Sequence, residues 1–508
     1  PCGDSCMYRP DVAGCFWVEK KLYTGTVCKI NFSDTNYRAV VQEDELNCVI
    51  VRINKVPSKI LEDLINNDDC NVILLELDDG KYLSVFNAYV QRGTFGMRLD
   101  DGSLMDNNSE IVLVSSSAIE GNKFFALSDK FKEFHFEITD GYELIGLTPY
   151  DLNSGYKNIV SSKKIEIPIE NQSITVNTSL GKILFAVFPK HWFKRDSFSI
   201  GFSHYISLEL KDSLEVAQFR DKLKIITDFF SILCGEQVTI NRLDIVEEEK
   251  QKVNFFAYKG YCNFPRRKLN TLDNSGTDTN NFKRISLFKL TDFQDLEAAL
   301  NYWFEHYKAL YNAQQAYSRI LLDEDTKIVT VNKFLAAMQL IEGYSQAYVD
   351  EKQAEKTFKK RKAEIIKELK KQEDKDYVEA GLAMPGIAFR EACINFYWKG
   401  ISIFSEISKE TFKEQYEQSL ISKIVNDRNF YTHSSRRIKP KLHFDKLMDI
   451  AVLTKGLYRC LVLASMGMGK EVIKKRFYHN RTMEAKLYQV FNIQIKAERQ
   501  LSKFDSRM

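Results

Sequence analysis

The pattern of apolar and polar positions changes along this chain from a two-residue period to a helical period. In the first half, short apolar runs alternate with polar positions as half-buried β-strands do. Asp79-Gly80 separates two such runs, at 71–77 and 81–90, and this dipeptide is typical of a tight hairpin turn. The strand-like runs end near Tyr261. We therefore expect residues 1–262 to form a β-rich domain, either a sandwich or barrel-like.

One amphipathic helix interrupts this β-rich region. Residues 213–235 have the apolar spacing of a helix, with Ser213 predicted as the N-cap and Gly235 as the residue that ends it. Strand-like runs then resume, so the helix belongs to the same region of the chain.

From Leu290 onward, the apolar positions recur with a helical period. A helix is predicted to begin near Thr291 and Asp292, both common N-terminal residues of helices. Its core-facing stripe is spaced i, i+3, i+7 and i+10 and consists of Leu300, Trp303, Tyr307 and Leu310. We expect residues 290–508 to form an all-α bundle, joined to the β-rich domain by a turn-rich connector at 263–289. The fold class is therefore α+β, with two regions of different architecture.

A second amphipathic helix, within 333–348, carries an acidic residue on its apolar side. Leu335, Met338 and Ile341 line one face, and Glu342 follows Met338 by one turn. Glu342 therefore shares the apolar face of this helix.

Composition and charge restrict the kind of protein that this chain forms. With 508 residues, 44% of them apolar, it has enough material for more than one packed core. A net charge of +3 does not by itself indicate a polyanion partner, so any basic surface must be local. The segment 351–375 has ten Lys or Arg and six Asp or Glu, which indicates a solvated helix or helical hairpin, or a contact surface for RNA.

The sequence gives no sign of a membrane or secretory location. The most apolar stretch, from Leu447, is interrupted by Lys455 and Arg459, and no secretory signal is present, so we expect a cytoplasmic protein without a membrane partner. Ten cysteines in so long a chain suit reduced thiols.

One group of cysteines is close enough in sequence to be considered as a metal site. Cys2, Cys6 and Cys15 are either incidental thiols or part of a zinc site whose fourth ligand cannot be named. We expect no cofactor.

The segment NDRNFYTHSSRR, residues 426–437, contains one of the seven histidines. On a helix, Asn429 and His433 lie about 40° apart, while Arg428 and His433 lie about 140° apart. One helix therefore does not bring all three side chains together. Read by itself, the segment is typical of a helix C-terminus with a basic flank, because a cation there interacts favourably with the helix dipole.

The order of the two regions changes this interpretation. RNFYTH has the R-N-x3-H form of the motif of the HEPN superfamily, a group of helical-bundle proteins that includes many endoribonucleases. The preceding helix KFLAAMQLIEGYSQAY resembles the acidic helix of ApeA-like anti-phage HEPN proteins. The β-rich half, with FWVEKKLYTGTV near its start, is similar to the N-terminal domain of that family.

The resemblance implies a catalytic site and its residues. His433 would be the general acid or base, Arg428 the cation that stabilises the phosphate, and Asn429 a polar partner. Glu342 would support Arg428 or His433. The basic segment after the motif, with Arg436, Arg437, Lys439 and Lys441, is the candidate RNA contact.

The resemblance also implies an activity and an assembly. RNA would be cut without a metal at a site shared by two chains of a homodimer or higher even oligomer, leaving a 2′,3′-cyclic phosphate and a 5′-hydroxyl. The β-rich half would sense a phage-derived or cellular trigger. The alternative is a non-catalytic HEPN protein that dimerises or binds a nucleotide and has a ligand-binding β domain. A third possibility is a carbohydrate-binding β domain with purely structural helices.

Overall fold

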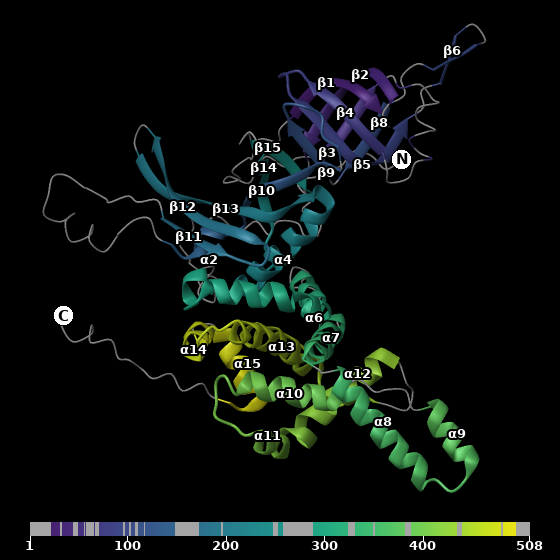
Figure 1. Ribbon diagram of the computed structural model, residues 1–508, viewed down its shortest axis with the longest axis vertical. Helices are drawn as coiled ribbons and strands as arrows, with labels where there is room; N and C mark the ends of the chain where they lie inside the picture. The colour runs from purple at the N-terminus through teal and green to yellow at the C-terminus, as the bar shows by residue number, and fades with distance from the viewer. Residues whose placement is uncertain are drawn as a thin grey trace, which may run out of the picture.

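The computed structural model describes residues 22 to 493 with internal gaps (Figure 1). The gaps are 31–32, 44–48, 55, 57–63, 65, 67–70, 95–96, 101–102, 107–109, 116, 127, 148–171, 195–196, 247–251, 258–287, 324–330, 349–350, 382–387, 434–438 and 479–480. Cys2, Cys6, Cys15 and most of the predicted connector lie outside the described residues.

Six strands near the N-terminus close into a ring. They are β1 (Leu22–Ile30), β2 (Ser33–Glu43), β3 (Val49–Asn54), β4 (Asn71–Leu77), β5 (Tyr82–Thr94) and β8 (Glu110–Ser115). Their order is β5-β4-β1-β2-β3-β8, and β8 also pairs with β5. Alternate side chains fill the ring with a core of its own, which includes Val27, Val51 and Leu113. The barrel-like form of the predicted β-rich domain is therefore confirmed.

The sheet continues beyond this ring through β9 (Ser117–Gly121). The continuation has the order β11-β12-β13-β10-β14-β15-β9. Its strands are β10 (Lys130–Ile138), β11 (Gln172–Asn177), β12 (Gly181–Lys194), β13 (Ser197–Glu215), β14 (Ile240–Val246) and β15 (Lys252–Ala257). A separate hairpin is formed by β6 (Met97–Asp100) and β7 (Ser103–Asp106). Helices α2 (Gly141–Ile145) and α4 (Val216–Cys234) pack on this second part of the sheet.

The rest of the described chain is helical, as predicted. Its helices are α6 (Leu296–Asp323), α7 (Val331–Ala347), α8 (Glu351–Glu368), α9 (Gln372–Gly381), α10 (Phe389–Ile401), α11 (Lys409–Tyr416), α12 (Ser422–His433), α13 (Phe444–Ser465), α14 (Lys470–Tyr478) and α15 (Arg481–Phe491). A 3-10 turn, Leu290–Asp292, precedes α6, and a π-helical turn, Glu417–Ile421, precedes α12. In Figure 1 the bundle lies below the sheet, and α8 and α9 extend from it as a hairpin.

One hydrophobic core joins the second part of the sheet to the helical bundle. It runs from the strands through α4 and α6 to α13 without interruption, and the predicted stripe of α6 lies within it. Trp303 is fully buried, and its ring centroid lies 6.2 Å from that of Phe229 on α4. The two regions with different periodicity are therefore packed as one body at this junction.

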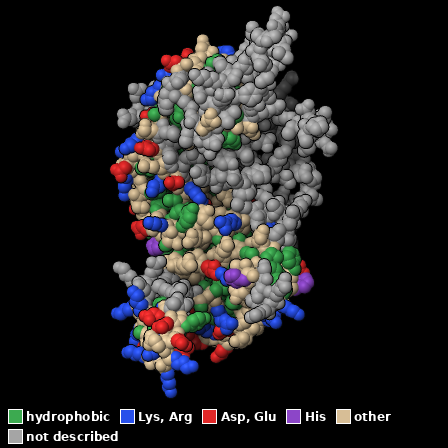
Figure 2. All heavy atoms as spheres, turned by 90° about the vertical axis from the view of Figure 1, so that its right-hand side faces the viewer, with side chains coloured by type: hydrophobic (Ala, Val, Ile, Leu, Met, Phe, Trp, Pro, Cys, Tyr) green, Lys and Arg blue, Asp and Glu red, His purple; other side chains and the backbone are tan. Residues whose placement is uncertain are grey.

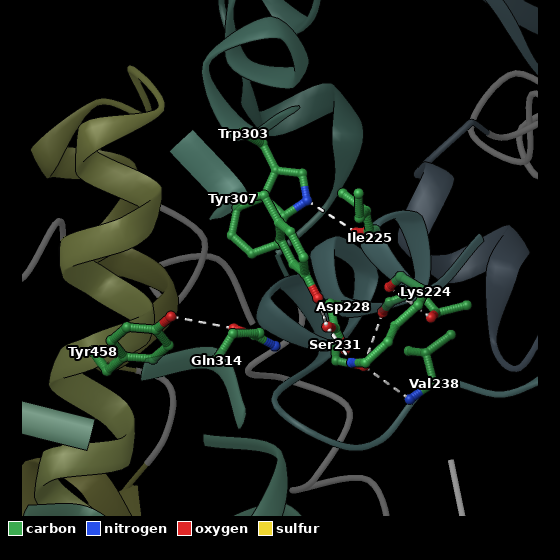
Figure 3. Close-up of polar contacts among 10 residues, drawn as sticks. Lys224, Ile225, Asp228, Ser231, Val238, Trp303, Tyr307, Gln314 and Tyr458 are labelled. Carbon is green, nitrogen blue, oxygen red and sulfur yellow. Dashed lines mark hydrogen bonds and ion pairs between the residues drawn. The ribbon is translucent and has the colours of Figure 1, made fainter. Parts of the chain in front are cut away.

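Polar contacts fix the geometry of the same junction (Figure 3). Trp303 Nε1 donates to the carbonyl of Ile225 at 2.9 Å, and the Tyr307 hydroxyl donates to Asp228 at 2.5 Å. Lys224 Nζ also donates to Asp228, at 2.8 Å, so this buried carboxylate is paired with a cation. Burial next to that carboxylate raises the pKa of Tyr307 well above its usual value. Tyr307 therefore remains a neutral donor across the junction.

A buried arginine completes the junction at the C-terminus of α4. Arg459 on α13 donates from Nε to the carbonyl of Ile232 and from Nη2 to that of Leu233, both at 2.8 Å. These carbonyls belong to the last turn of α4, where helix geometry leaves acceptors unpaired. Gly235 ends α4 with φ of 79°, and a Cβ there would lie 2.3 Å from Arg459 Nη1. The positive φ therefore favours glycine, and a larger residue would also displace the guanidinium of Arg459.

Two predicted helix starts are wrong. Ser213 lies within β13, because the pairing of β13 with β10 extends to Glu215, and α4 begins with a capping box of Glu215 and Gln218. Thr291 and Asp292 lie in the 3-10 turn. The Asp295 carboxylate instead accepts from the backbone nitrogen of Ala298 at the start of α6, 2.9 Å away. Gly235 does end α4 as predicted.

Candidate active site on helix α12

Helix α12 positions the motif through its apolar side. Ile421, in the π-helical turn, and Ile424 are fully buried, and Arg428 follows Ile424 by one turn. Arg428 therefore continues the stripe that faces the bundle. In agreement, α12 packs against α7 and α10. The apolar spacing of the helix thus directs the arginine toward those two helices.

Arg428 is held by three groups. Its Nη2 donates to Glu342 Oε1 on α7 at 2.7 Å, and its Nη1 donates to the Asn429 side-chain oxygen at 3.2 Å. Its guanidinium carbon lies 5.2 Å from the centre of the Phe389 ring on α10, a cation–π distance. The side chains of Arg428 and Glu342 are 24% and 30% exposed, so the ion pair is partly shielded and one side stays open to solvent.

His433 lies in the last turn of α12 and is exposed. Within the described part of the chain, its ring makes no hydrogen bond or ion pair; residues 434–438, which follow it, are outside that part. Five helical positions separate it from Arg428, which corresponds to about 140° around the axis. Arg428 faces α7 while His433 is accessible at the end of the helix. On this helix the two side chains therefore leave the axis in different directions.

The structure places a buried carboxylate directly before the motif. Asp427 is fully buried, and it accepts hydrogen bonds from the backbone nitrogens of Lys441 at 2.6 Å and Leu442 at 2.9 Å. The side chain of Asn426 donates to Asp427 at 3.0 Å and to the carbonyl of Lys439 at 2.8 Å. Asp427 and Asn426 therefore bind the segment 439–442 to the motif helix.

This anchoring determines where half of the predicted RNA contacts lie. Lys439 and Lys441 are exposed and belong to the anchored segment, so they are displayed beside α12. Arg436 and Arg437 lie outside the described residues. Sequence reasoning missed Asp427, because its partners are 14 and 15 residues away and no local pattern connects them.

A cysteine lies behind the ion pair. Cys393 on α10 is fully buried, and its burial, followed by the nearby Glu342 carboxylate, raises the pKa of its thiol well above the usual value. Cys460 is also buried, and burial raises the pKa of its thiol to about 12. Both remain protonated near neutral pH, so neither is an activated nucleophile.

Among the described residues, no group of three or more His, Cys, Asp or Glu is arranged to hold a metal ion. In the same part of the chain, no helix has the length and apolar character needed to cross a membrane.

The fold and the site define the class of this protein: a β-rich region packed on a helical bundle that bears an R-N-x3-H motif. Residues 42–303 match the family model described as ApeA N-terminal domain 1, and residues 335–472 match the model described as Apea-like HEPN. The chain therefore belongs to the ApeA-like HEPN family, and the resemblance found in the sequence is confirmed. Searches of curated proteins and of solved structures gave no match.

Proposed function

We propose that this protein is an anti-phage defence endoribonuclease that cleaves RNA without a metal at a site formed by two copies of α12. Membership in an anti-phage HEPN family supports the defence role. HEPN domains are generally ribonucleases, which supports the activity. The observation that carries the proposal is the arrangement on α12. A positioned guanidinium with one open side lies five residues before an exposed histidine.

The chemistry of RNA cleavage needs these two side chains. Attack of the ribose 2′-hydroxyl on the adjacent phosphate requires a base for its proton and an acid for the departing 5′-oxygen. A histidine can serve either role, and the exposed ring of His433 is accessible to substrate. With one arginine and one histidine facing each phosphate, His433 takes one of the two proton-transfer roles and water takes the other. Arg428 stabilises the charge that develops on the phosphoryl oxygens. The expected products are a 2′,3′-cyclic phosphate and a 5′-hydroxyl.

The separation of Arg428 and His433 around α12 supports a site that is shared by two chains. A two-fold axis beside α12 would let the arginine of one chain and the histidine of the other face one phosphate. HEPN domains typically dimerise and bind RNA, which supports a homodimer or a higher even oligomer. Lys439 and Lys441, anchored beside α12, would contact the strand near the cut. The β-rich half would receive a phage-derived trigger.

Cleavage in EDTA tests the activity. The wild-type protein should cut cellular RNA or tRNA into products that end in a cyclic phosphate, and His433→Ala and Arg428→Ala should both be inactive. Cleavage that survives His433→Ala would exclude this site assignment. A folded, dimeric protein that binds RNA or nucleotides and never cuts, with phage lysate supplied as the source of trigger, would favour the non-catalytic alternative.

Mixing the two inactive variants tests the shared site. A dimer of one Arg428→Ala chain and one His433→Ala chain keeps a single intact pair, with the arginine and histidine on different chains. Random mixing should then restore about a quarter of wild-type activity, since half of the dimers are mixed and each keeps one of two pairs. If the acting pair belonged to a single chain, mixing would restore nothing.

A further inference from the structure

The α8–α9 hairpin extends away from the bundle, and its described side chains add nothing to the core. None of the described side chains between Lys356 and Glu379 is buried. Figure 1 shows α8 leaving the end of α7 with α9 beside it, outside the packed helices. Because none of these described side chains is buried, packing in the core does not account for the composition of the hairpin.

The positive charge of this hairpin is concentrated along α8 and the turn that follows it. Between Lys356 and Lys371 there are eight Lys or Arg and two Glu, a local charge of +6, whereas the whole chain carries +3. Figure 2 shows many Lys and Arg side chains, with Asp and Glu among them, at the lower end of the molecule, where α8 and α9 lie. The whole hairpin, Glu351–Gly381, has ten Lys or Arg and eight Asp or Glu, so its excess of positive charge lies on α8 and the turn that follows it, while α9 is acidic.

Four lysines of α8 form one stripe along the helix, here termed the lysine stripe. It consists of Lys356, Lys359, Lys360 and Lys367, all exposed. At 100° per residue these positions fall within an arc of about 100°, and the stripe is about 16 Å long at 1.5 Å per residue. Ala363 lies within the arc, so no acidic residue interrupts it.

The opposite side of α8 faces α9. Phe358 lies about 160° around the helix from Lys356. Lys362 Nζ is 5.9 Å from the centre of the Phe358 ring and donates to the carbonyl of Glu379, at 2.7 Å, near the end of α9. These contacts fix the rotation of α8 in the hairpin. The lysine stripe therefore points away from α9 and into solvent.

The hairpin follows in sequence the helix that carries Glu342 of the candidate site. Helix α7 carries Glu342, the partner of Arg428, and ends at Ala347; α8 begins at Glu351. A single nucleic-acid strand bound along the stripe would be held by the element that adjoins the cleavage site. Lysine ammonium groups neutralise phosphates as point charges and do not read bases.

We propose that the lysine stripe of α8 is a docking surface for the phosphate backbone of single-stranded RNA, separate from the site of cleavage. This inference rests on the proposed function, because that function makes RNA the polyanion that the protein meets. The stripe increases the affinity for RNA independently of sequence and leaves the chemical step unchanged.

The test removes the positive charge of three lysines of the stripe. Lys356→Gln, Lys360→Gln and Lys367→Gln are combined in one variant, since these exposed side chains contribute nothing to the core. The matched control combines Lys130→Gln, Lys211→Gln and Lys308→Gln, which are exposed on other elements and remove the same total charge. Both variants are made in a His433→Ala background, and the binding of a fluorescent single-stranded RNA is measured over a range of salt.

The stripe variant should show a weaker dependence of binding on salt. Three lost phosphate contacts lower the slope of log affinity against log salt by about 2 for a single strand. Between about 50 and 200 mM salt, the parent should therefore lose roughly twentyfold more affinity than the stripe variant, and the control should match the parent. With His433 intact, the stripe variant should have a raised KM and an unchanged kcat.

Other outcomes separate the two proposals. Equal slopes for the stripe variant and the control would overturn the docking surface even if the protein cleaves RNA. Stripe-dependent RNA binding by a protein that never cuts would retain the docking surface and refute the proposed function. If the stripe variant lost binding to polyglutamate and kept its binding to RNA, the inference would be overturned and an acidic protein would be identified as the partner.

Discussion

Removal of the buried carboxylate before the motif gives a sharp prediction. Asp427→Ala leaves the backbone nitrogens of Lys441 and Leu442 without their acceptor, and these hydrogen bonds measure 2.6 and 2.9 Å. Hydrogen bonds to charged groups contribute about 1.5–3 kcal/mol each, and water recovers part of this once the segment opens. A net local loss of about 3 kcal/mol is expected, equivalent to roughly a 100-fold increase in the opening of this segment.

Hydrogen exchange measures this opening directly, because the two affected amides are the ones that exchange. A peptide that covers 439–443 should lose its protection in Asp427→Ala and part of it in Asp427→Asn, which keeps one acceptor oxygen. The matched control is Asp445→Asn, whose side chain is 87% exposed nearby. Protection in Asp427→Ala equal to that of the control would refute the idea that Asp427 anchors the segment.

Three further changes test the ion pair and the junction. Glu342→Gln keeps an oxygen for the motif arginine but removes its charge, so RNA cleavage should fall about tenfold, or about 1.4 kcal/mol; faster cleavage would mean that Glu342 restrains the site instead. Tyr307→Phe removes the hydroxyl that donates to Asp228 and should cost about 1–2 kcal/mol in urea unfolding, whereas Tyr311→Phe, at an exposed position, should cost almost nothing. Arg459→Met removes two donors from the end of α4. In scanning calorimetry it should lower the melting temperature of the β-rich and helical regions together; a lower melting temperature in one region alone would contradict their shared core.

The sequence alone determined the local structure of this protein. The two-residue period and Asp79-Gly80 predicted β4, β5 and their turn, and the spacing of Trp303 and Tyr307 predicted the buried side of α6. These features follow from contacts between residues that are close in sequence, where side-chain direction repeats regularly. The motif could also be found, because its residues lie on one helical segment.

Tertiary structure decided everything that joins distant segments. Glu342 and Arg428 are 86 residues apart, and Asp427 binds amides 14 and 15 residues further on. No periodicity encodes such pairs, because they depend on how the helices pack. The same reason explains the wrong start of α4: strand pairing with β10 keeps Ser213 extended where its local propensity favours a cap. Packing also decided that the β-rich region and the bundle share one core through α4 and Arg459.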